Sequence, residues 1–357
     1  MSNYFEFNDK VAFHPGYYIK EIVDESGLTQ EDFAKRLGTT PKNLSILIRG
    51  EQSLSIEMAS KLSRMLGTSV GYWLGLQQAY NEMYAEFLMA EDLKHEKEIF
   101  KLIDYKYFRD HFGLPSLPRK TEEQISCIRD FLSVASLTVL GERNLAVSFR
   151  SYKEDLSLSN IVNANALTQI AVNQALKTEA PSYDKKKFMG AVSFALTQTQ
   201  NHETFLPVIK DAFLKAGVVL VVLPNLKNSG INGATKKVDG KMMLMVNDRR
   251  HYADTFWFSL FHEIGHILDG DLGMSFSNDA EDRADLYAQS ALIPQEQYCD
   301  FILHHKQFNR DIIVEFAKSI DRDPGIVLGR LMKDKLVEHS EAELSNKLRH
   351  KYNIVIS

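Results

Sequence analysis

The pattern of apolar and polar positions predicts short, capped helices from about Pro15 to Gln78. A helix from Thr29 to Arg36, a turn at Gly38 and a second helix from Thr40 to Ile48 have the length and capping of a helix-turn-helix. Asp32 completes the capping box of the first helix, and Pro41 suits the first turn of the second. Another helix begins at Ser55, after which apolar residues recur at helical spacing until a glycine: Met58, Ala59, Leu62, Met65, Leu66 and then Gly67.

The middle of the chain, from about residue 79 to residue 201, keeps a helical pattern but has few chemically informative features. Charged stretches such as Glu91 to Lys97 are typical of solvated helix faces. Asn144 to Arg150 is a candidate short strand. We therefore expect a helical connecting region here.

After about His202 the pattern changes to mixed α and β. Val218 to Leu223 is rich in β-branched residues, and Lys241 to Val246 is a second candidate strand. We expect the two strands to form one small antiparallel sheet. Asp254 can then cap a long helix that ends at Gly270. The apolar face of that helix is supplied mainly by Trp257, Phe258, Phe261, Ile264 and Leu268.

Taken together, these elements predict an α+β chain that is mostly α-helical. Residues 1–80 are expected to form a five-helix helix-turn-helix domain, and residues 81–201 a helical connecting region. Residues 202–357 are expected to form a third region around the long helix and the small antiparallel sheet.

Composition and charge restrict the function classes. The 357 residues are 44% hydrophobic and 25% charged, which suits a globular chain of two or three domains. A net charge of -5 gives no global attraction to nucleic acid or anionic lipid, so any DNA binding must be local. The two cysteines, Cys127 and Cys299, favour a reducing compartment. The N-terminus lacks a signal-peptide core, and the longest apolar run, Ala216 to Leu223, is too short to span a bilayer, so we expect a cytoplasmic protein without a membrane partner.

The long helix carries a group of residues typical of zinc sites. His262 and His266 are four residues apart, so both imidazoles project from one helix face, and Glu263 lies between them. Catalytic zinc needs a third protein ligand and an open fourth position. Glu281 is the candidate third ligand, and Asp285, one turn later, can accept a hydrogen bond from the outer ring nitrogen of a ligating histidine. We expect that histidine to be His262.

This ligand set predicts zinc-dependent peptide hydrolysis. Zinc would activate a water, and Glu263 would take its proton and deliver it to the leaving amine. The sequence leaves the oxyanion donor open among Tyr287, Tyr298, His304 and His305. The strand from Lys241 to Val246 is a candidate edge for pairing with an extended substrate. The alternative interpretation is that the histidines are buried and hydrogen-bonded only, with the two acidic residues on a solvated helix.

The second helix of the helix-turn-helix predicts the DNA contacts. Thr40, Lys42, Asn43 and Ser45 are expected to face phosphates or base edges, and Arg49 to lie near the DNA backbone. Ile46 lies on that same face, where a cation would be expected. This leaves a second interpretation, in which the module is a helical protein-interaction domain.

Two known families resemble the chain. The N-terminal part resembles the Cro/C1-type (XRE) helix-turn-helix of HigA-like antitoxins, on His14-Pro15-Gly16, Leu28-Thr29-Gln30, Arg49-Gly50 and Trp73-Leu74. The second half resembles the ImmA/IrrE metallopeptidases, on Phe256 to Phe261, the zinc motif, Ala284 to Ala288, Leu292 to Pro294 and Pro324 to Leu331. Val147 to Ser151 is similar to a stretch common in such fusions. The chain departs from these relatives at Ile46 and at the acidic Asp269 and Asp271.

The resemblance implies a bacterial or phage regulator with a zincin-like peptidase domain that cleaves a repressor or antitoxin. His262, His266 and Glu281 would be the zinc ligands and Glu263 the catalytic base. The implied partners are double-stranded operator DNA, a protein substrate and a second copy of the chain in a homodimer. One alternative is a HigA-like regulator or antitoxin whose metal domain senses or binds partners without proteolysis. A third is an interaction protein that uses neither site.

Overall fold

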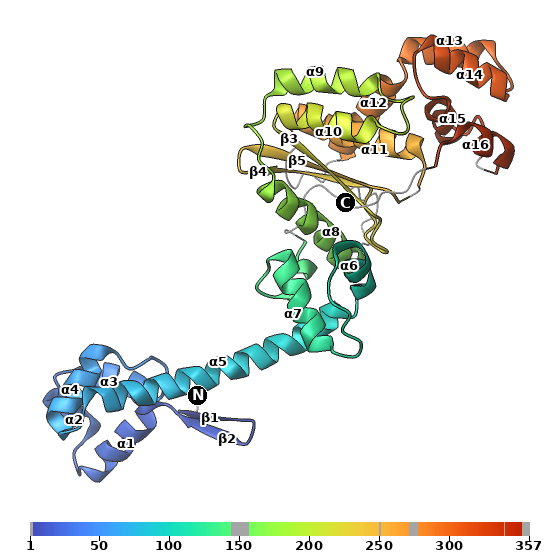
Figure 1. The fold of residues 1–357 in the computed structure, drawn as a ribbon. Helices are drawn as coiled ribbons and strands as arrows, with labels where there is room; N and C mark the ends of the chain where they lie inside the picture. Colours follow the sequence, from blue (N-terminus) through green and yellow to red (C-terminus); the bar gives the residue numbers. More distant parts are fainter. Residues whose placement is uncertain (1–2, 144–156, 250, 271–277, 339, 352–357) are drawn as a thin grey trace. The chain divides into compact units, whose positions relative to one another are not determined.

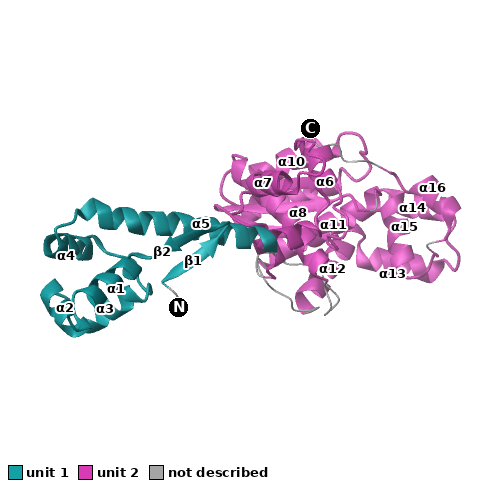
Figure 2. Ribbon diagram, turned by 90° about the horizontal axis from the view of Figure 1, so that it is seen from below, with its two compact units in different colours: residues 1–95 teal, residues 96–357 magenta. Residues whose placement is uncertain are grey.

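The structure is a computed structural model that describes residues 3–143, 157–249, 251–270, 278–338 and 340–351. The chain divides into two compact units, residues 1–95 and residues 96–357 (Figure 2). The boundary expected at residue 80 falls inside helix α5 (Val70–Phe100), and the one expected at residue 201 falls inside the second unit. Figure 1 shows the elements of both units, which form a mostly helical chain with little strand, as the sequence predicted.

The N-terminal unit contains the predicted helix-turn-helix. Its helices are α1 (Pro15–Glu25), α2 (Gln30–Leu37), α3 (Pro41–Ile48), α4 (Ile56–Leu66) and the beginning of α5. The predicted caps are confirmed: the side chains of Thr29, Thr40 and Ser55 accept hydrogen bonds from backbone N–H groups in the first turns. Gly38 and Gly67 end their helices in the left-handed conformation, as expected for glycine.

A close contact between α1 and the end of α3 holds this unit together. A Cβ atom on Gly16 would lie 2.0 Å from the carbonyl oxygen of Leu47, so only glycine allows the two backbones to approach this closely. Ala34, Leu44 and Leu47 are fully buried, as their predicted core positions require. The His14-Pro15-Gly16 sequence therefore has a packing role.

A hairpin that was not predicted from the sequence lies in front of α1. Strands β1 (Tyr4–Phe7) and β2 (Lys10–Phe13) pair antiparallel. Asn8 and Asp9 both have positive φ, which fits the two-residue turns that favour asparagine and aspartate. The alternation of apolar residues around Asn8 and Asp9 was the signal that could have revealed the hairpin.

The second unit begins with helices that surround a small sheet. They are α6 (Tyr105–Phe112), α7 (Thr121–Leu132), a 3-10 turn (Leu137–Gly141), α8 (Leu158–Lys177), α9 (Lys185–Leu196) and α10 (Phe205–Lys215). The strand expected over Asn144 to Arg150, and the similarity noted over Val147 to Ser151, lie outside the described residues. Among the described helices, none is both long and apolar enough to cross a membrane.

The sheet has three described strands, and the predicted antiparallel pairing is wrong. The order is β3 (Val218–Leu223), β5 (Lys241–Asn247) and β4 (Gly233–Val238), with β5 in the middle. β3 runs parallel to β5, whereas β4 pairs antiparallel with it. The continuous apolar runs of β3 and β5 are explained by burial on both faces, which is typical of parallel strands. β4 escaped prediction although Asp239-Gly240 is a strong hairpin signal.

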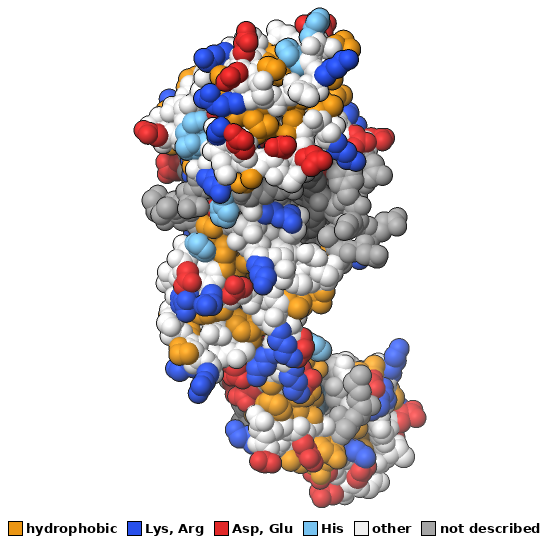
Figure 3. All heavy atoms as spheres, turned by 90° about the vertical axis from the view of Figure 1, so that its right-hand side faces the viewer, with side chains coloured by type: hydrophobic (Ala, Val, Ile, Leu, Met, Phe, Trp, Pro, Cys, Tyr) orange, Lys and Arg blue, Asp and Glu red, His pale blue; other side chains and the backbone are white. Residues whose placement is uncertain are grey.

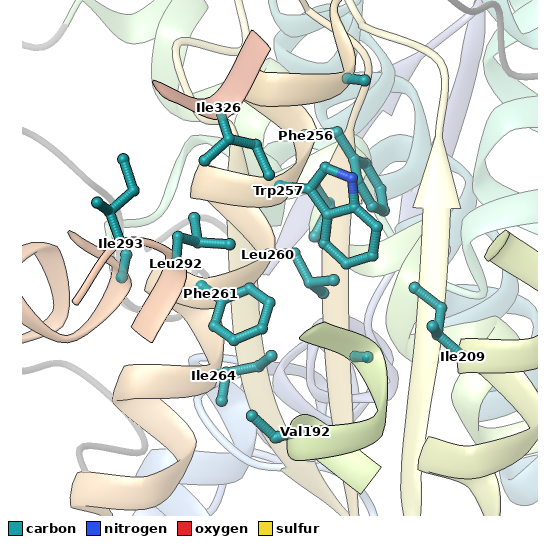
Figure 4. Packing of buried hydrophobic residues seen from close by; sticks show 14 of the residues in the cluster. Val192, Ile209, Phe256, Trp257, Leu260, Phe261, Ile264, Leu292, Ile293 and Ile326 are labelled. Carbon is teal, nitrogen blue, oxygen red and sulfur yellow. The ribbon is translucent and has the colours of Figure 1, made fainter. Parts of the chain in front are cut away.

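Helices cover both faces of this sheet. Figure 1 shows α8 on one face and α10 with α11 (Ala253–Asp269) on the other. Figure 4 shows the core beside α11, where Phe256, Trp257 and Phe261 pack with Leu292 and Ile326. The remaining helices are α12 (Asn278–Leu292), α13 (Gln295–His304), α14 (Arg310–Ser319), α15 (Pro324–Lys333) and α16 (Ala342–Leu348).

Helix α11 ends at Gly270 as predicted, but Asp254 does not cap it. The N-cap is Tyr252, and Asp254 lies buried in the first turn. There its carboxylate accepts hydrogen bonds of 3.0 and 2.8 Å from Arg349, from the far end of the described chain. An ion pair between the buried Asp254 and the half-buried Arg349 thus anchors the start of α11, where the sequence had predicted that Asp254 caps the helix.

Candidate metal centre and nucleic-acid interface

Helices α11 and α12 cross closely enough for their side chains to converge. A Cβ atom on Gly265 would lie 3.1 Å from the Cα atom of Ala284, so the small residues at these two positions permit the approach. His262 and His266 lie on either side of Gly265 along α11, and Glu281 and Asp285 on either side of Ala284 along α12. The two histidines of α11 and the two acidic residues of α12 therefore lie next to the point where the helices cross.

The structure brings the three expected ligands together. The Nε2 atoms of His262 and His266 are 3.1 Å apart. One carboxylate oxygen of Glu281 lies 3.4 Å from the Nε2 atom of His262, and the other lies 3.4 Å from that of His266. The possible ligand atoms of the three residues all lie within 4.8 Å of one another.

Asp285 is placed to orient His262. Its Oδ1 atom lies 2.7 Å from the Nδ1 atom of His262, which is the histidine expected from the sequence. When Nδ1 carries the proton and donates it to Asp285, the Nε2 lone pair faces Glu281 and His266. Lys333 of α15 donates to the Oδ2 atom of Asp285 at 3.1 Å. Asp285 therefore has one oxygen on the histidine and the other on a lysine that the sequence analysis did not identify.

Glu263 lies against the beginning of strand β4. A Cβ atom on Gly233 would lie 2.5 Å from both the Cγ and the Oε1 atoms of Glu263, so a larger residue at that position would displace the carboxylate. Glu263 is buried, with an exposed fraction of 4%. The first residue of β4 and the glutamate between the two histidines thus share one narrow space.

Burial and charge fix the state of Glu281. Burial raises the pKa of Glu281, but hydrogen bonding and charge from His262 and His266 outweigh this and lower it to about 2. The carboxylate is therefore ionised at neutral pH, which is the form that binds a cation.

The chemistry of this cluster fits a zinc ion. Two imidazole nitrogens and one carboxylate form the kind of N and O ligand set that catalytic zinc takes, and they leave a further position open. The buried Nδ1 atom of His266 has no hydrogen-bond partner among the described residues, whereas the Nε2 atoms of both histidines face Glu281. A divalent cation between the Nε2 atoms and the carboxylate would be bound by all three groups.

The structure shows the surroundings of the four candidate oxyanion donors. Tyr298 donates its hydroxyl to Asp334 at 2.8 Å. His304 and His305 each place Nδ1 near a backbone carbonyl of their own helix, at 2.8 and 2.9 Å. Tyr287 lies on α12, the helix that carries Glu281, and burial raises the pKa of its hydroxyl so that it keeps its proton.

The substrate edge expected over Lys241 to Val246 is contradicted by the sheet order. Those residues belong to β5, which is hydrogen-bonded on both sides, to β3 and to β4. A central strand has no free backbone groups to offer a peptide. The edge near Glu263 is β4, and this strand begins at Gly233.

Most of the side chains expected to contact DNA form hydrogen bonds within the N-terminal unit. The Thr40 hydroxyl caps α3. Asn43 donates to the Thr39 hydroxyl at 2.9 Å, and its own side-chain oxygen accepts from Gln52 at 2.8 Å. Lys42 is exposed, without a hydrogen bond or ion pair among the described residues. Lys42 is thus the exposed cation on α3.

Arg49 and Ser45 form a small network with Glu51. Arg49 donates to Ser45 and to both carboxylate oxygens of Glu51, the latter at 2.7 and 2.9 Å. These hydrogen bonds hold the pKa of Glu51 below its usual range. Glu51 could not be predicted as the partner of Arg49, because their pairing depends on the backbone turn after α3.

The charge balance of the N-terminal unit is acidic. Residues 1–95 contain 9 lysines and arginines against 13 aspartates and glutamates, a difference of -4. On the face of the molecule seen in Figure 3, basic and acidic side chains are interspersed. Attraction to a phosphate backbone must therefore come from a few cations on the α2–α3 surface.

Comparison with known proteins identifies the N-terminal module. A helix-turn-helix family model matches residues 19–73. The chain is 39% identical over 79 residues to the HTH-type transcriptional regulator YddM of Escherichia coli, covering 22% of this chain and 84% of that protein. It is 30% identical over 80 residues to virulence-associated protein I of Dichelobacter nodosus, covering 22% and 74%. A solved structure described as an antidote protein of a plasmid maintenance system from Nostoc punctiforme is 30% identical, covers 24% of this chain and 92% of its own, and has a TM-score of 0.23.

Proposed function

Because the chain belongs, through residues 19–73, to the helix-turn-helix family of DNA-binding regulators, we propose that it is an operator-binding regulator with a zinc endopeptidase centre in its second unit. The proposed substrate is a protein partner of the repressor or antitoxin type. A homodimer would match the two half-sites of a palindromic operator. The observation that supports the peptidase is the convergence of His262, His266 and Glu281 beside Glu263.

The proposed centre assigns a role to each group of this chain. His262, His266 and Glu281 would hold zinc, and Asp285 would orient His262 through the 2.7 Å contact. When bound, zinc lowers the pKa of a coordinated water and polarises a peptide carbonyl. Glu263 would hold the proton released at this site and pass it to the leaving amine. The absence of a side chain at Gly233 leaves room for that carboxylate.

The decisive experiment separates metal binding from hydrolysis. We expect purified full-length protein to contain one zinc per chain by elemental analysis and to cleave a protein partner. Glu263→Gln should retain the zinc and lose the cleavage, because the amide cannot take a proton. Glu296→Gln, an exposed glutamate on α13, is the matched control and should retain both. Cleavage by Glu263→Gln at the wild-type rate would refute the peptidase.

A second candidate function is regulation by metal binding without proteolysis. The burial of the centre favours it, since His262 and His266 are only 2% and 3% exposed. In this case zinc would stabilise one form of the second unit and change operator binding. Zinc-dependent operator binding that is identical in wild type and Glu263→Gln, with no cleavage of co-expressed partners, would favour the sensor over the peptidase.

A further inference from the structure

Lys333, the last residue of α15, reaches the candidate metal centre from a third helix. Its ammonium group donates to the Oδ2 atom of Asp285 at 3.1 Å. The Oδ1 atom of the same carboxylate lies 2.7 Å from the Nδ1 atom of His262. The three residues come from α15, α12 and α11 in turn, so a chain of contacts leads from α15 to a proposed zinc ligand.

The packing of α15 fixes the position of Lys333. α15 packs on α11, and a Cβ atom on Gly329 would lie 2.7 Å from a carboxylate oxygen of that helix. The buried Arg330 donates to Asp334 at 2.7 Å, and Tyr298 of α13 donates to the same carboxylate at 2.8 Å. The end of α15 is therefore held on both sides of Lys333, and the neighbouring Asp334 is bonded to other residues.

The pair between Lys333 and Asp285 differs from the surface ion pairs of this unit. The side chain of Lys333 is 46% exposed, but that of Asp285 is only 16% exposed. In the pair between Lys347 and Glu343 of α16, the two side chains are 52% and 76% exposed. An ion pair between two exposed side chains holds neither of them firmly, because both can rotate in solvent. Lys333 instead acts on a carboxylate that is largely buried beside His262.

A carboxylate that is held at both oxygens has less freedom to turn away from its histidine. Asp285 fixes the ring and the tautomer of His262, so that the Nε2 atom of His262 faces the other proposed ligands. Without Lys333, the Oδ2 atom would lose this donor. The freedom that the carboxylate then gained would be lost again when a cation binds, which weakens binding.

The positive charge of Lys333 acts in the opposite sense, because it repels a cation. The carboxylate of Asp285 and the ring of His262 lie between the ammonium group and the proposed position of the ion. Solvent and salt also screen an ammonium group that is half exposed. We therefore expect the positioning effect to be the larger of the two.

We propose that Lys333 is a positioning residue of the metal centre, which holds Asp285 so that His262 is oriented for zinc and thereby strengthens zinc binding. This inference rests on the proposed zinc centre. It adds a residue that acts through Asp285, and it makes the end of α15 part of the centre.

The test measures the dissociation constant of zinc, with full-length zinc-free protein in competition with a fluorescent chelator. Lys333→Met keeps most of the aliphatic side chain and removes the donor. Groups that orient a zinc-bound histidine contribute about 10- to 100-fold to affinity, so a residue one contact further away should contribute about three- to tenfold. Lys333→Arg keeps a charged donor and should bind zinc within about twofold of wild type.

A double-mutant cycle separates positioning from a general effect on the fold. Asp285→Ala alone should weaken zinc binding by about 10- to 100-fold. Adding Lys333→Met to Asp285→Ala should cause no further loss, because the lysine then has no carboxylate to hold. The thermal midpoint of zinc-free Lys333→Met should equal that of wild type, since a half-exposed ion pair contributes little to stability.

Lys347→Met is the matched control. It removes the same charge and breaks an exposed ion pair of the same unit, so its zinc affinity should equal that of wild type. Unchanged zinc binding by Lys333→Met would overturn the proposal, and tighter binding would do so by showing that repulsion dominates. An equal loss in Lys347→Met would assign the effect to net charge and would also overturn it.

The two proposals can fail separately. If wild type and Lys333→Met bind zinc equally well, the zinc centre stands and the role of Lys333 is refuted. If Lys333→Met weakens zinc binding as expected but wild type cleaves no protein partner, the positioning role stands and the peptidase is refuted. A wild type that binds no zinc would refute both.

Discussion

The helix-turn-helix and the candidate metal centre both depend on two helices that approach closely, yet they present their functional groups differently. In the N-terminal unit, Gly16 admits the backbone of Leu47, and the polar groups of α3 face outward. In the second unit, Gly265 admits Ala284, and the polar groups point at one another inside the fold. The exposed side chains of α3 form hydrogen bonds with adjacent residues of the N-terminal unit. The side chains of the candidate metal centre, which come from α11 and α12, instead point toward one common position.

The difference explains why the side chains of the candidate metal centre lie together, whereas the expected DNA contacts are bonded to neighbours in their own unit. Buried polar groups must be paired, so His262 and Glu281 are fixed by packing, and the half-buried Asp285 is held by its contact with His262. Exposed groups are held only by weak, screened interactions. Arg49 and Glu51 can therefore exchange partners when a phosphate arrives. The predictions below test this contrast, from the largest expected effect to the smallest.

Removing a buried ligand should have the largest effect. We expect Glu281→Ala to lose its bound zinc, because the two histidines alone leave the cation without its carboxylate ligand. Elemental analysis after dialysis measures this. Binding of operator DNA should persist, since α12 has no part in the helix-turn-helix. A variant that retains one zinc per chain would contradict the ligand assignment.

Adding a side chain where α1 and α3 cross in the N-terminal unit should have the next largest effect, on the free energy of unfolding. Gly16→Ala places a Cβ atom 2.0 Å from the Leu47 carbonyl oxygen, so α1 and α3 must separate. Overpacking of this kind costs about 1–3 kcal/mol of unfolding free energy. Chemical denaturation followed by the fluorescence of Trp73, which is buried in this unit, measures the loss in a Trp257→Phe background.

Gly75→Ala is the control for this crossing. A Cβ atom there meets nothing within 4 Å, and the residue lies inside α5. We expect this variant to be as stable as wild type or slightly more stable, because alanine favours a helix over glycine. Equal unfolding curves for both variants would show that the α1–α3 approach is not tight.

Releasing an exposed arginine should have a moderate effect. Glu51→Gln removes the charge that holds Arg49, so that the guanidinium can bind a phosphate. We expect operator DNA to bind a few-fold more tightly, with a steeper dependence on salt concentration. Fluorescence anisotropy across a salt series measures both. Glu82→Gln, on α5, is the charge-matched control, and an equal gain there would assign the effect to net charge alone.

Acidification should have the smallest effect, and it should act on the N-terminal unit. His14 caps α1 by accepting a hydrogen bond from Gly16 on Nδ1 at 3.0 Å, and burial lowers its pKa from 6.5. A histidine whose pKa is lowered by folding stabilises the fold above its unfolded pKa. That contribution is lost as the pH falls through the lower folded value.

The measurement is the thermal midpoint of Trp73 fluorescence between pH 7.5 and pH 5, in the same Trp257→Phe background. His14→Asn keeps a capping oxygen but does not titrate in this range, so its midpoint should fall less than that of wild type. Parallel curves for the two proteins would remove His14 as the cause.

Local signals were sufficient to predict much of the fold. The caps at Thr29, Thr40 and Ser55 were identified because a side chain and a backbone N–H three residues later decide them. The parallel pairing of β3 with β5 was not, because a fully buried apolar run does not show the direction of its neighbour. Asp254 was assigned to a cap because its partner, Arg349, is distant in sequence.

The convergence of the candidate metal ligands could be predicted from the sequence for the same reason. The spacing of His262 and His266 on one helix determines their common face. Glu281 and Asp285 come from a second helix with its own spacing, and the structure brings both to the first. Lys333 and Gly233 could not be identified, since their roles arise only from tertiary contacts.

The arrangement of the sheet has a consequence for the order of folding. The β4–β5 hairpin closes through two residues, Asp239 and Gly240, whereas Val218 of β3 must find Met242 across the intervening chain. Local hairpins form within microseconds, and distant pairings follow later because of the entropy of loop closure. We therefore expect β3 to pair after the β4–β5 hairpin has formed. By then the hairpin has placed Gly233 at the start of β4, the position that packs against Glu263.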